Sequence, residues 1–309
     1  MRLRRFAAAA AVGTVVFAST AAALPSSQID ISQPIPALTA QALDARYTAD
    51  TRMIVQAARA AGRSGDTSLA RSLDGMRGQH FIDFNPRGSG LAVEVVGDLA
   101  QARRVVILVP GSDTSLATFG ARGTASPEGA ARALAAQVQR LDPGASLAII
   151  AWLGYATPDT FSPAVMTSGD AGQGAAALRP LVDDLVRHGR QVALLCHSYG
   201  SVVCGLAAPR LPVTDIAVFG SPGMDASCVR ALHTTSRVWV GRGASDWIRH
   251  VPHVHFLGLG FGQDPMDPAF GARLFAAGAG GHSGYFVPGS IALRNLAWIA
   301  LGDPAGVVR

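Results

Sequence analysis

Five short, continuous apolar runs, separated by segments of helical character, constrain the fold of this chain more than any other feature. The runs are residues 105–109, 147–152, 192–196, 216–219 and 238–240. Such runs are typical of strands buried on both faces, as in a parallel sheet covered by helices. Segments of helical character at 127–141, 174–188 and 199–208 lie between most of them. The alternation predicts an α/β fold with a mostly parallel central sheet flanked by helices.

The flanking segments complete the predicted organisation. We expect an extended linker at 24–38, an N-terminal helical segment at 39–78 and the α/β domain at 79–305. That domain should begin with a hairpin whose strands, 81–84 and 91–96, are joined by the turn 86–90. A helix at 290–301, capped by Ser290, should close it.

Residues 1–23 have the three parts of a secretory signal peptide. Three arginines lie within the first five residues, an uncharged stretch rich in alanine and valine follows, and three alanines end the segment. Because Ser19 and Thr20 shorten the apolar stretch, we expect a cleaved signal, with an uncleaved N-terminal anchor as the alternative. The protein should therefore be secreted or associated with the cell envelope, with no integral membrane span in the mature chain.

The charge of the chain does not indicate a nucleic-acid partner. Removal of the three arginines in residues 1–23 takes the formal net charge from +5 to +2. No basic run is interleaved with aromatic side chains, as a nucleic-acid surface would require. We expect a small-molecule substrate and no nucleic acid, and the oligomeric state is left open.

Ser198 lies in the most specific chemical motif. The apolar run that ends at Cys196 leads through His197 and Ser198 into a helical segment, the context of a nucleophile elbow with the pattern G-x-S-x-G. Gly200 fits that pattern, whereas Cys196 replaces the first glycine and is small enough to be tolerated. A serine at the end of a strand can also be purely structural, so the motif indicates a nucleophile only together with a candidate base and acid elsewhere in the chain.

A serine nucleophile requires a histidine to take its proton and a carboxylate to orient that histidine. Their expected order along the chain is serine, acid, histidine. His282 is the candidate base because it lies in a glycine-flanked loop just before the terminal helix. Asp246 is the candidate acid because it follows the last apolar run, with Asp225 and Asp264 as alternatives.

The oxyanion that forms in acyl transfer needs two backbone N–H donors. Tyr199, the residue after the candidate nucleophile, should supply one, and Ser112, in the loop after residues 105–109, the other, with Asp113 as the alternative. The segment 154–168 is a candidate pocket wall through three large side chains, although it could simply cover the sheet edge. These side chains are Tyr155, Phe161 and Met166.

The three cysteines leave one unpaired if a disulfide forms. Cys204 lies four residues beyond Gly200 on the predicted helix, hence on the face that packs near Cys196. The sequence leaves two possibilities open, a Cys196–Cys204 disulfide and two buried free thiols. If the disulfide forms, Cys228 is the unpaired residue.

We expect no metal and no cofactor. His250, His253 and His255 are close in sequence, but no carboxylate or cysteine lies at convincing zinc spacing, and Pro252 argues against one regular element presenting all three. The glycines of residues 258–262 lack the following helix of a phosphate-binding loop.

Taken together, the ordered motifs resemble the α/β-hydrolase superfamily. They are the Ser198 elbow, the strand that ends at Pro110-Gly111, the segment 220–225, Asp246 and the loop 281–285. Within that superfamily the chain is similar to a largely uncharacterised group of secreted actinobacterial α/β-hydrolases with an N-terminal helical extension. The resemblance covers about residues 81–301 and implies ester or amide hydrolysis without defining a substrate.

We therefore expect a secreted serine hydrolase with a Ser-His-Asp triad and an acyl-enzyme intermediate. Only about fifteen residues separate the turn at 220–223 from the run at 238–240, which leaves no room there for a long lid. This favours short or soluble acyl esters. A serine peptidase or acyltransferase with the same triad, and a non-catalytic secreted binding protein of this fold, are the alternatives.

Overall fold

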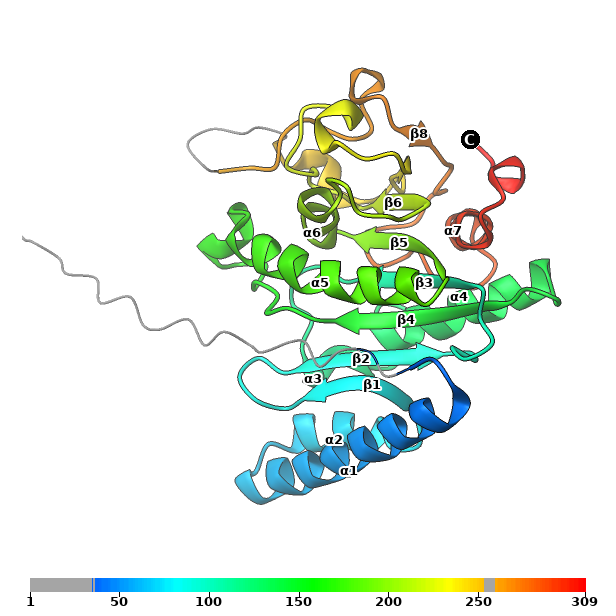
Figure 1. The fold of residues 1–309 in the computed structure, drawn as a ribbon. Helices are drawn as coiled ribbons and strands as arrows, with labels where there is room; N and C mark the ends of the chain where they lie inside the picture. The colour runs from blue at the N-terminus through cyan, green and yellow to red at the C-terminus, as the bar shows by residue number, and fades with distance from the viewer. Residues whose placement is uncertain (1–34, 36, 253–258) are drawn as a thin grey trace, which may run out of the picture.

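The computed structural model describes residues 35, 37–252 and 259–309, and its centre is an eight-stranded sheet (Figure 1). The strand order is β1-β2-β4-β3-β5-β6-β7-β8. β1 and β2 form the predicted antiparallel hairpin, β2 is also antiparallel to β4, and all other neighbours are parallel. The strands are β1 (His80–Asn85), β2 (Leu91–Val96), β3 (Arg104–Val109), β4 (Leu147–Leu153), β5 (Gln191–His197), β6 (Asp215–Phe219), β7 (Arg237–Gly241) and β8 (Arg273–Leu274).

Helices cover both faces of this sheet, as an apolar parallel sheet requires. α5 (Gly169–Arg187) and α6 (Gly200–Ala207) bury their apolar sides on one face, and α4 (Pro127–Leu141) and α7 (Ile291–Leu301) do so on the other. Each face forms a separate hydrophobic cluster because side chains along a buried strand alternate between the two faces. The remaining short helices are α3 (Leu116–Phe119) and the 3₁₀ turns η1 (Pro163–Met166), η2 (Val229–Leu232), η3 (Trp247–His250), η4 (Pro268–Phe270) and η5 (Pro304–Gly306).

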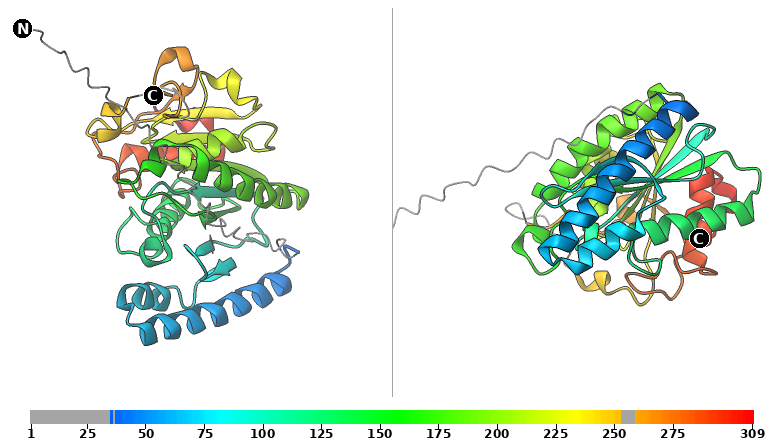
Figure 2. Two further views of the ribbon diagram at one scale, coloured as in Figure 1. Left: turned by 90° about the vertical axis from the view of Figure 1, so that its left-hand side faces the viewer. Right: turned by 90° about the horizontal axis from the view of Figure 1, so that it is seen from below.

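The N-terminal helices pack beside the β1 edge of the sheet (Figure 2). α1 (Ala40–Ser64) begins at Thr39, whose side chain accepts the Ala42 N–H, and ends at Gly65 in the left-handed conformation. α2 (Thr67–Gly75) follows directly. Ile54 of α1 and Leu73 of α2 are completely buried and belong to the same cluster as α4 and α7. The two helices therefore extend the core of the domain.

The sequence predicts the strands and α4 closely and the start of α5 less well. The five apolar runs correspond to β3 to β7, and Ser290 caps α7 by accepting the Leu293 N–H. α5 begins at Gly169, five residues before the predicted start at Gly174. The first turn of α5 contains glycines, which have a low helix propensity. Packing of the buried Ala171 outweighs this low propensity.

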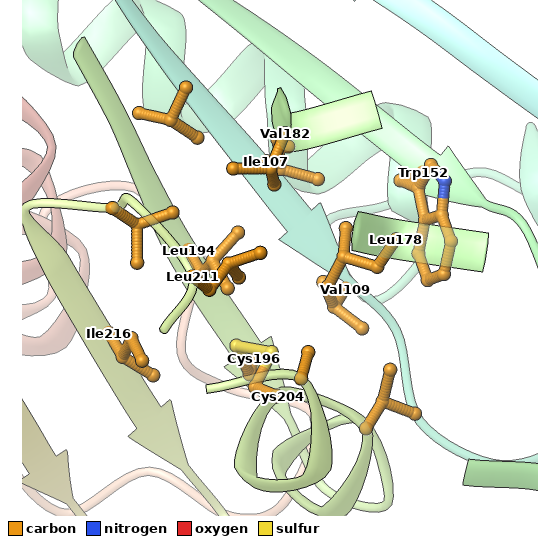
Figure 3. Packing of buried hydrophobic residues seen from close by; sticks show 14 of the residues in the cluster. Ile107, Val109, Trp152, Leu178, Val182, Leu194, Cys196, Cys204, Leu211 and Ile216 are labelled. Atoms are coloured by element: carbon orange, nitrogen blue, oxygen red, sulfur yellow. A yellow bond between two sulfur atoms is a disulfide. The ribbon is translucent and has the colours of Figure 1, made fainter. Parts of the chain in front are cut away.

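A disulfide joins Cys196 at the end of β5 to Cys204 on α6. Both cysteines lie in the hydrophobic cluster between the sheet and the helices α5 and α6 (Figure 3). The bond explains why a cysteine replaces the usual glycine at position 196, since its side chain is half of a cross-link. Cys228 is free and partly exposed.

None of the helices in the described part of the chain is both long enough and apolar enough to span a bilayer. The predicted signal segment, residues 1–23, and nearly all of the predicted linker lie outside the described residues.

Candidate active site

Ser198 occupies a sharp turn between β5 and α6. Its backbone φ is 52°, in the left-handed region that a residue with a side chain adopts only at a cost. The Ser198 N–H donates to the Phe219 carbonyl of β6 at 3.0 Å and holds the turn on the neighbouring strand. A Cβ on Gly200 would approach the Pro110 carbonyl oxygen to 2.6 Å. Glycine is therefore required at position 200 for α6 to lie this close to the loop after β3.

His282 connects Ser198 to Asp246 through two hydrogen bonds. Its Nε2 lies 2.9 Å from Ser198 Oγ, and its Nδ1 lies 2.9 Å from Asp246 Oδ1. Because an ionised carboxylate only accepts, Nδ1 carries the ring proton and Nε2 accepts the serine O–H. The three residues come from loops after β5, after β7 and before α7. The fold thus brings together three residues that are distant in sequence.

Asp246 is completely buried, yet the pKa of its carboxyl lies below the ordinary value. Burial raises that pKa, and hydrogen bonds from His282, the Tyr285 hydroxyl and the Ile248 N–H outweigh the effect. The Tyr285 hydroxyl donates to Asp246 Oδ2 at 2.5 Å. Gly220 packs beside the pair, where a Cβ would lie 3.0 Å from Asp246 Oδ2. These contacts keep an ionised acceptor inside the protein.

His197, the residue before Ser198, holds the His282 backbone. Its Nε2 lies 2.8 Å from the His282 carbonyl oxygen, which can only accept, so Nε2 carries a proton. Burial, and to a lesser extent the nearby His282, lower the pKa of His197 to about 4, so the ring is neutral at pH 7. The sequence carries no local signal for this contact, because the two residues are 85 positions apart.

Two more residues of this site were missed. Tyr285 lies three residues after His282 in the motif Gly-His-Ser-Gly-Tyr, and burial raises the pKa of its hydroxyl, which stays protonated as a donor. The ring of Trp247, adjacent to Asp246, lies 4.6 Å from the His282 ring between centroids. The sequence offers one signal for these two residues: Tyr285 is close in sequence to His282, and Trp247 is next to Asp246.

The predicted oxyanion donors lie beside Ser198. Ser112 and Tyr199 both line the cavity onto which Ser198 opens. Within the described residues, neither backbone N–H donates to a protein acceptor, so both are available to a ligand. The alternative donor, the Asp113 N–H, is already bonded to the Pro158 carbonyl at 3.1 Å. The arrangement therefore favours Ser112 over Asp113.

The cavity has a volume of about 820 Å³ and a largely apolar lining. Phe161 and Met166 line it, as the sequence predicts, but the prediction for Tyr155 is wrong. Tyr155 is buried, stacks between Trp152 and Tyr199, and donates its hydroxyl to the Pro110 carbonyl at 2.8 Å. The chain turns back into the core directly after β4. Tyr155 therefore packs in the core and contacts the loop after β3 from the side of the core.

The structure also separates the alternatives for the acid. His282 Nδ1 is bonded to Asp246, whereas Asp264 accepts from Arg242 at 2.9 Å and Asp225 lies in a turn with a φ of 55°. No group of three or more histidine, cysteine, aspartate or glutamate side chains is arranged to hold a metal ion within the described residues. Two members of the histidine cluster, His253 and His255, lie outside them.

Comparison with known proteins identifies the family. Residues 85–256, more than half of the chain, match the model of a family described as "Alpha/beta hydrolase". This chain belongs to the α/β-hydrolase family. The match spans β2 to β7 and includes Ser198 and Asp246, while His282 lies beyond it.

The relatives of this hydrolase include mycobacterial proteins. "Uncharacterized protein Rv2079" of Mycobacterium tuberculosis is 31% identical over 248 residues, which cover 70% of this chain and 37% of that protein. "Uncharacterized protein Rv0963c" of the same organism is 32% identical over 143 residues, covering 44% and 53% of the two chains. The hydrolase thus spans little more than a third of the length of the first of these relatives.

Solved structures with a similar arrangement are more distant in sequence. A dienelactone hydrolase from Anabaena variabilis has 16% identity and a TM-score of 0.46, and covers 75% of this chain and 98% of its own. The "Dienelactone Hydrolase-like Promiscuous Phospotriesterase P91" from metagenomic libraries has 20% identity and a TM-score of 0.45, with coverages of 72% and 94%.

The hydrogen bond from Tyr285 to Asp246 yields a pH-dependent prediction. We expect Tyr285→Phe to lower the free energy of unfolding by about 1–3 kcal/mol at neutral pH, because a buried carboxylate loses a donor. A carboxyl whose folded-state pKa is depressed stabilises the fold above its unfolded pKa and loses this effect as the pH falls. The deficit of the variant in urea denaturation should therefore stay constant from about pH 7 to about pH 5 and shrink as the pH falls further, through the unfolded-state and then the folded-state pKa of Asp246.

Tyr155→Phe is the matched control for this experiment. It also removes one buried tyrosine hydroxyl, but the lost acceptor is the uncharged Pro110 carbonyl. Its deficit should be independent of pH. A deficit for Tyr285→Phe that stays equally constant would show that the phenol does not stabilise an ionised Asp246.

Proposed function

We propose that this protein is a serine hydrolase that cleaves carboxylic esters through an acyl-enzyme intermediate. The observation that carries the proposal is the continuous hydrogen-bonded chain from Ser198 Oγ through His282 to the buried Asp246. A buried carboxylate, a histidine in the corresponding tautomer and a serine hydroxyl on a turn that lines a cavity are the components that nucleophilic acyl transfer needs. Membership of the α/β-hydrolase family supports the same class of reaction.

In this mechanism Ser198 Oγ attacks the ester carbonyl as His282 Nε2 takes the serine proton. Asp246 stabilises the imidazolium that forms and keeps its Nδ1–H oriented. The Tyr199 and Ser112 N–H groups donate to the oxygen that becomes negatively charged. As the tetrahedral intermediate collapses, the carbon–oxygen bond to the alcohol breaks and His282 gives its proton to the departing alkoxide. A water activated by His282 then releases the acid and restores Ser198.

Labelling with a fluorophosphonate probe tests the proposed nucleophile. Wild-type protein should become labelled, and Ser198→Ala should lose the label completely because the attacking oxygen is gone. His282→Ala should slow labelling by at least about a hundredfold, since general-base assistance contributes factors of this order. Circular dichroism would verify that each variant is folded.

Ser201→Ala is the control for Ser198→Ala. Ser201 lies one turn along, is completely buried and donates to the Cys196 carbonyl at 3.3 Å, so its loss should leave labelling intact. Label that persists in Ser198→Ala would contradict the assigned nucleophile. A folded wild type that is never labelled would favour the non-catalytic alternative.

We further propose that the protein is exported and that residues 1–23 are removed. The Cys196–Cys204 disulfide supports this proposal because such bonds persist mainly in oxidising compartments. N-terminal sequencing of protein recovered from the culture medium or cell envelope of a producing bacterium should begin at Leu24. A chain retained in the cytoplasm with an intact N-terminus would contradict export.

A further inference from the structure

We infer that the substrate is a lipid ester whose acyl chain is long and uncharged. The inference rests on the proposed serine-hydrolase function and concerns the substrate of that same site. It departs from the expectation of short or soluble esters, which depended on the absence of a long lid. The lining of the cavity, and not the length of a lid, decides which acyl group has room beside Ser198.

The size of the cavity is the first observation. At about 820 Å³ it lies in the upper part of the range of about 300–1,000 Å³ that is typical of ligand pockets. An acyl group of two to four carbons would leave most of this volume unfilled. Because unfilled apolar volume contributes no binding free energy, the cavity favours a larger apolar group.

The inner wall of the cavity is a continuation of the hydrophobic core. Leu108 of β3, Leu195 of β5 and Phe219 of β6 line the cavity together with Ala130 of α4 and Phe286, and all five belong to one hydrophobic cluster. Each of these five residues is at most 7% exposed. An acyl chain placed between them leaves water almost completely. Each buried methylene then contributes about 0.8 kcal/mol, or about a fourfold gain in affinity.

The charged groups of the lining offer no partner to an acidic acyl group. Among the described residues no arginine or glutamate lines the cavity, and its single aspartate is Asp113. That carboxylate accepts from the Thr160 N–H at 2.9 Å and also from the Thr160 hydroxyl. The His197 ring is neutral at pH 7, and His282 is bonded to Ser198 and Asp246. An acidic acyl group would find no cationic partner among these residues, and any charged group placed against the buried apolar part of the lining would be desolvated at a cost of several kcal/mol.

The polar atoms of the two tyrosines in the lining are already satisfied. Tyr199 donates its hydroxyl to the Thr167 carbonyl at 2.7 Å and accepts the Ala171 N–H at 3.1 Å. Tyr285 donates to Asp246. Both rings therefore offer apolar surface, which suits hydrocarbon.

Three large apolar side chains of the lining are exposed to solvent. Phe161 is completely exposed, and Trp247 and Met166 are 48% and 45% exposed, although all three line the cavity. Large exposed apolar side chains that line one cavity are typical of a binding surface. The rest of the lipid molecule, beyond the scissile ester, would cover them.

A chain-length series tests the inference. The substrates are p-nitrophenyl butanoate and dodecanoate, both below the concentration at which they aggregate. Wild-type kcat/KM should be at least about tenfold higher for dodecanoate, because eight further methylenes leave water. Ala130→Leu places a larger side chain on the inner wall and should reduce that ratio at least about tenfold.

Ala136→Leu on α4 is the matched control, since Ala136 is exposed and does not line the cavity. It should retain the wild-type ratio. Phe161→Ser provides a second variant with little risk to folding and should raise KM for dodecanoate more than for butanoate. Phe161→Ser therefore keeps the inference testable if Ala130→Leu fails to fold.

The outcomes separate the two proposals. Wild-type protein that carries the fluorophosphonate label on Ser198 but hydrolyses butanoate as well as dodecanoate, or better, would overturn the lipid-ester inference and leave the serine hydrolase intact. A dodecanoate preference that neither Ala130→Leu nor Phe161→Ser reduces would also overturn the inference. A wild type with neither label nor turnover would refute the serine hydrolase itself.

Discussion

The left-handed backbone of Ser198 is the constraint on which the rest of the site depends. A non-glycine residue in this conformation costs on the order of 1–3 kcal/mol, and the fold offsets that cost with contacts on all sides. The Ser198 N–H is bonded to β6, and Gly200 lets α6 approach the loop after β3. The Cys196–Cys204 disulfide fastens the strand before the turn to the helix after it. These contacts keep the Ser198 backbone in the left-handed conformation, so its hydroxyl stays directed at His282.

The second requirement is a charge kept in the interior. Asp246 is buried, no arginine in the described part of the chain is bonded to it, and three hydrogen-bond donors hold its pKa below the ordinary value. Two of these donors, His282 and Tyr285, lie in one loop, so the loop is bound to the carboxylate at two points. His197 adds a third point through the His282 carbonyl. The histidine is consequently oriented before any ligand arrives.

The sequence predicts those features of the structure that are encoded by neighbouring residues, and it fails for contacts between distant segments. The apolar runs predict β3 to β7 because a strand that is buried on both faces needs an apolar residue at nearly every position. Ser198, Asp246 and His282 were chosen by their order and by their places after strands, and the structure brings the three together. Tyr155 was placed wrongly because a residue that follows a strand can turn toward the pocket or toward the core. The contacts of His197 and Tyr285 depend on the folding of a distant loop, which no local pattern encodes.

The volume of the cavity is likewise not encoded by any local sequence pattern. Sequence spacing showed that no long lid follows β6, and short esters were inferred from it. The volume beside Ser198 instead depends on side chains from β3, β5, β6 and α4, which are far apart in the chain and meet only in the folded protein.

The most direct test of the central claim is to trap the acyl-enzyme. Wild-type protein mixed with p-nitrophenyl acetate and quenched in acid within the first turnover would be digested and analysed by mass spectrometry. The account predicts an acetyl group on the peptide that contains Ser198, lost again once turnover is allowed to finish. Release of p-nitrophenol without an acetyl group on that peptide, or with one on another residue, would contradict it.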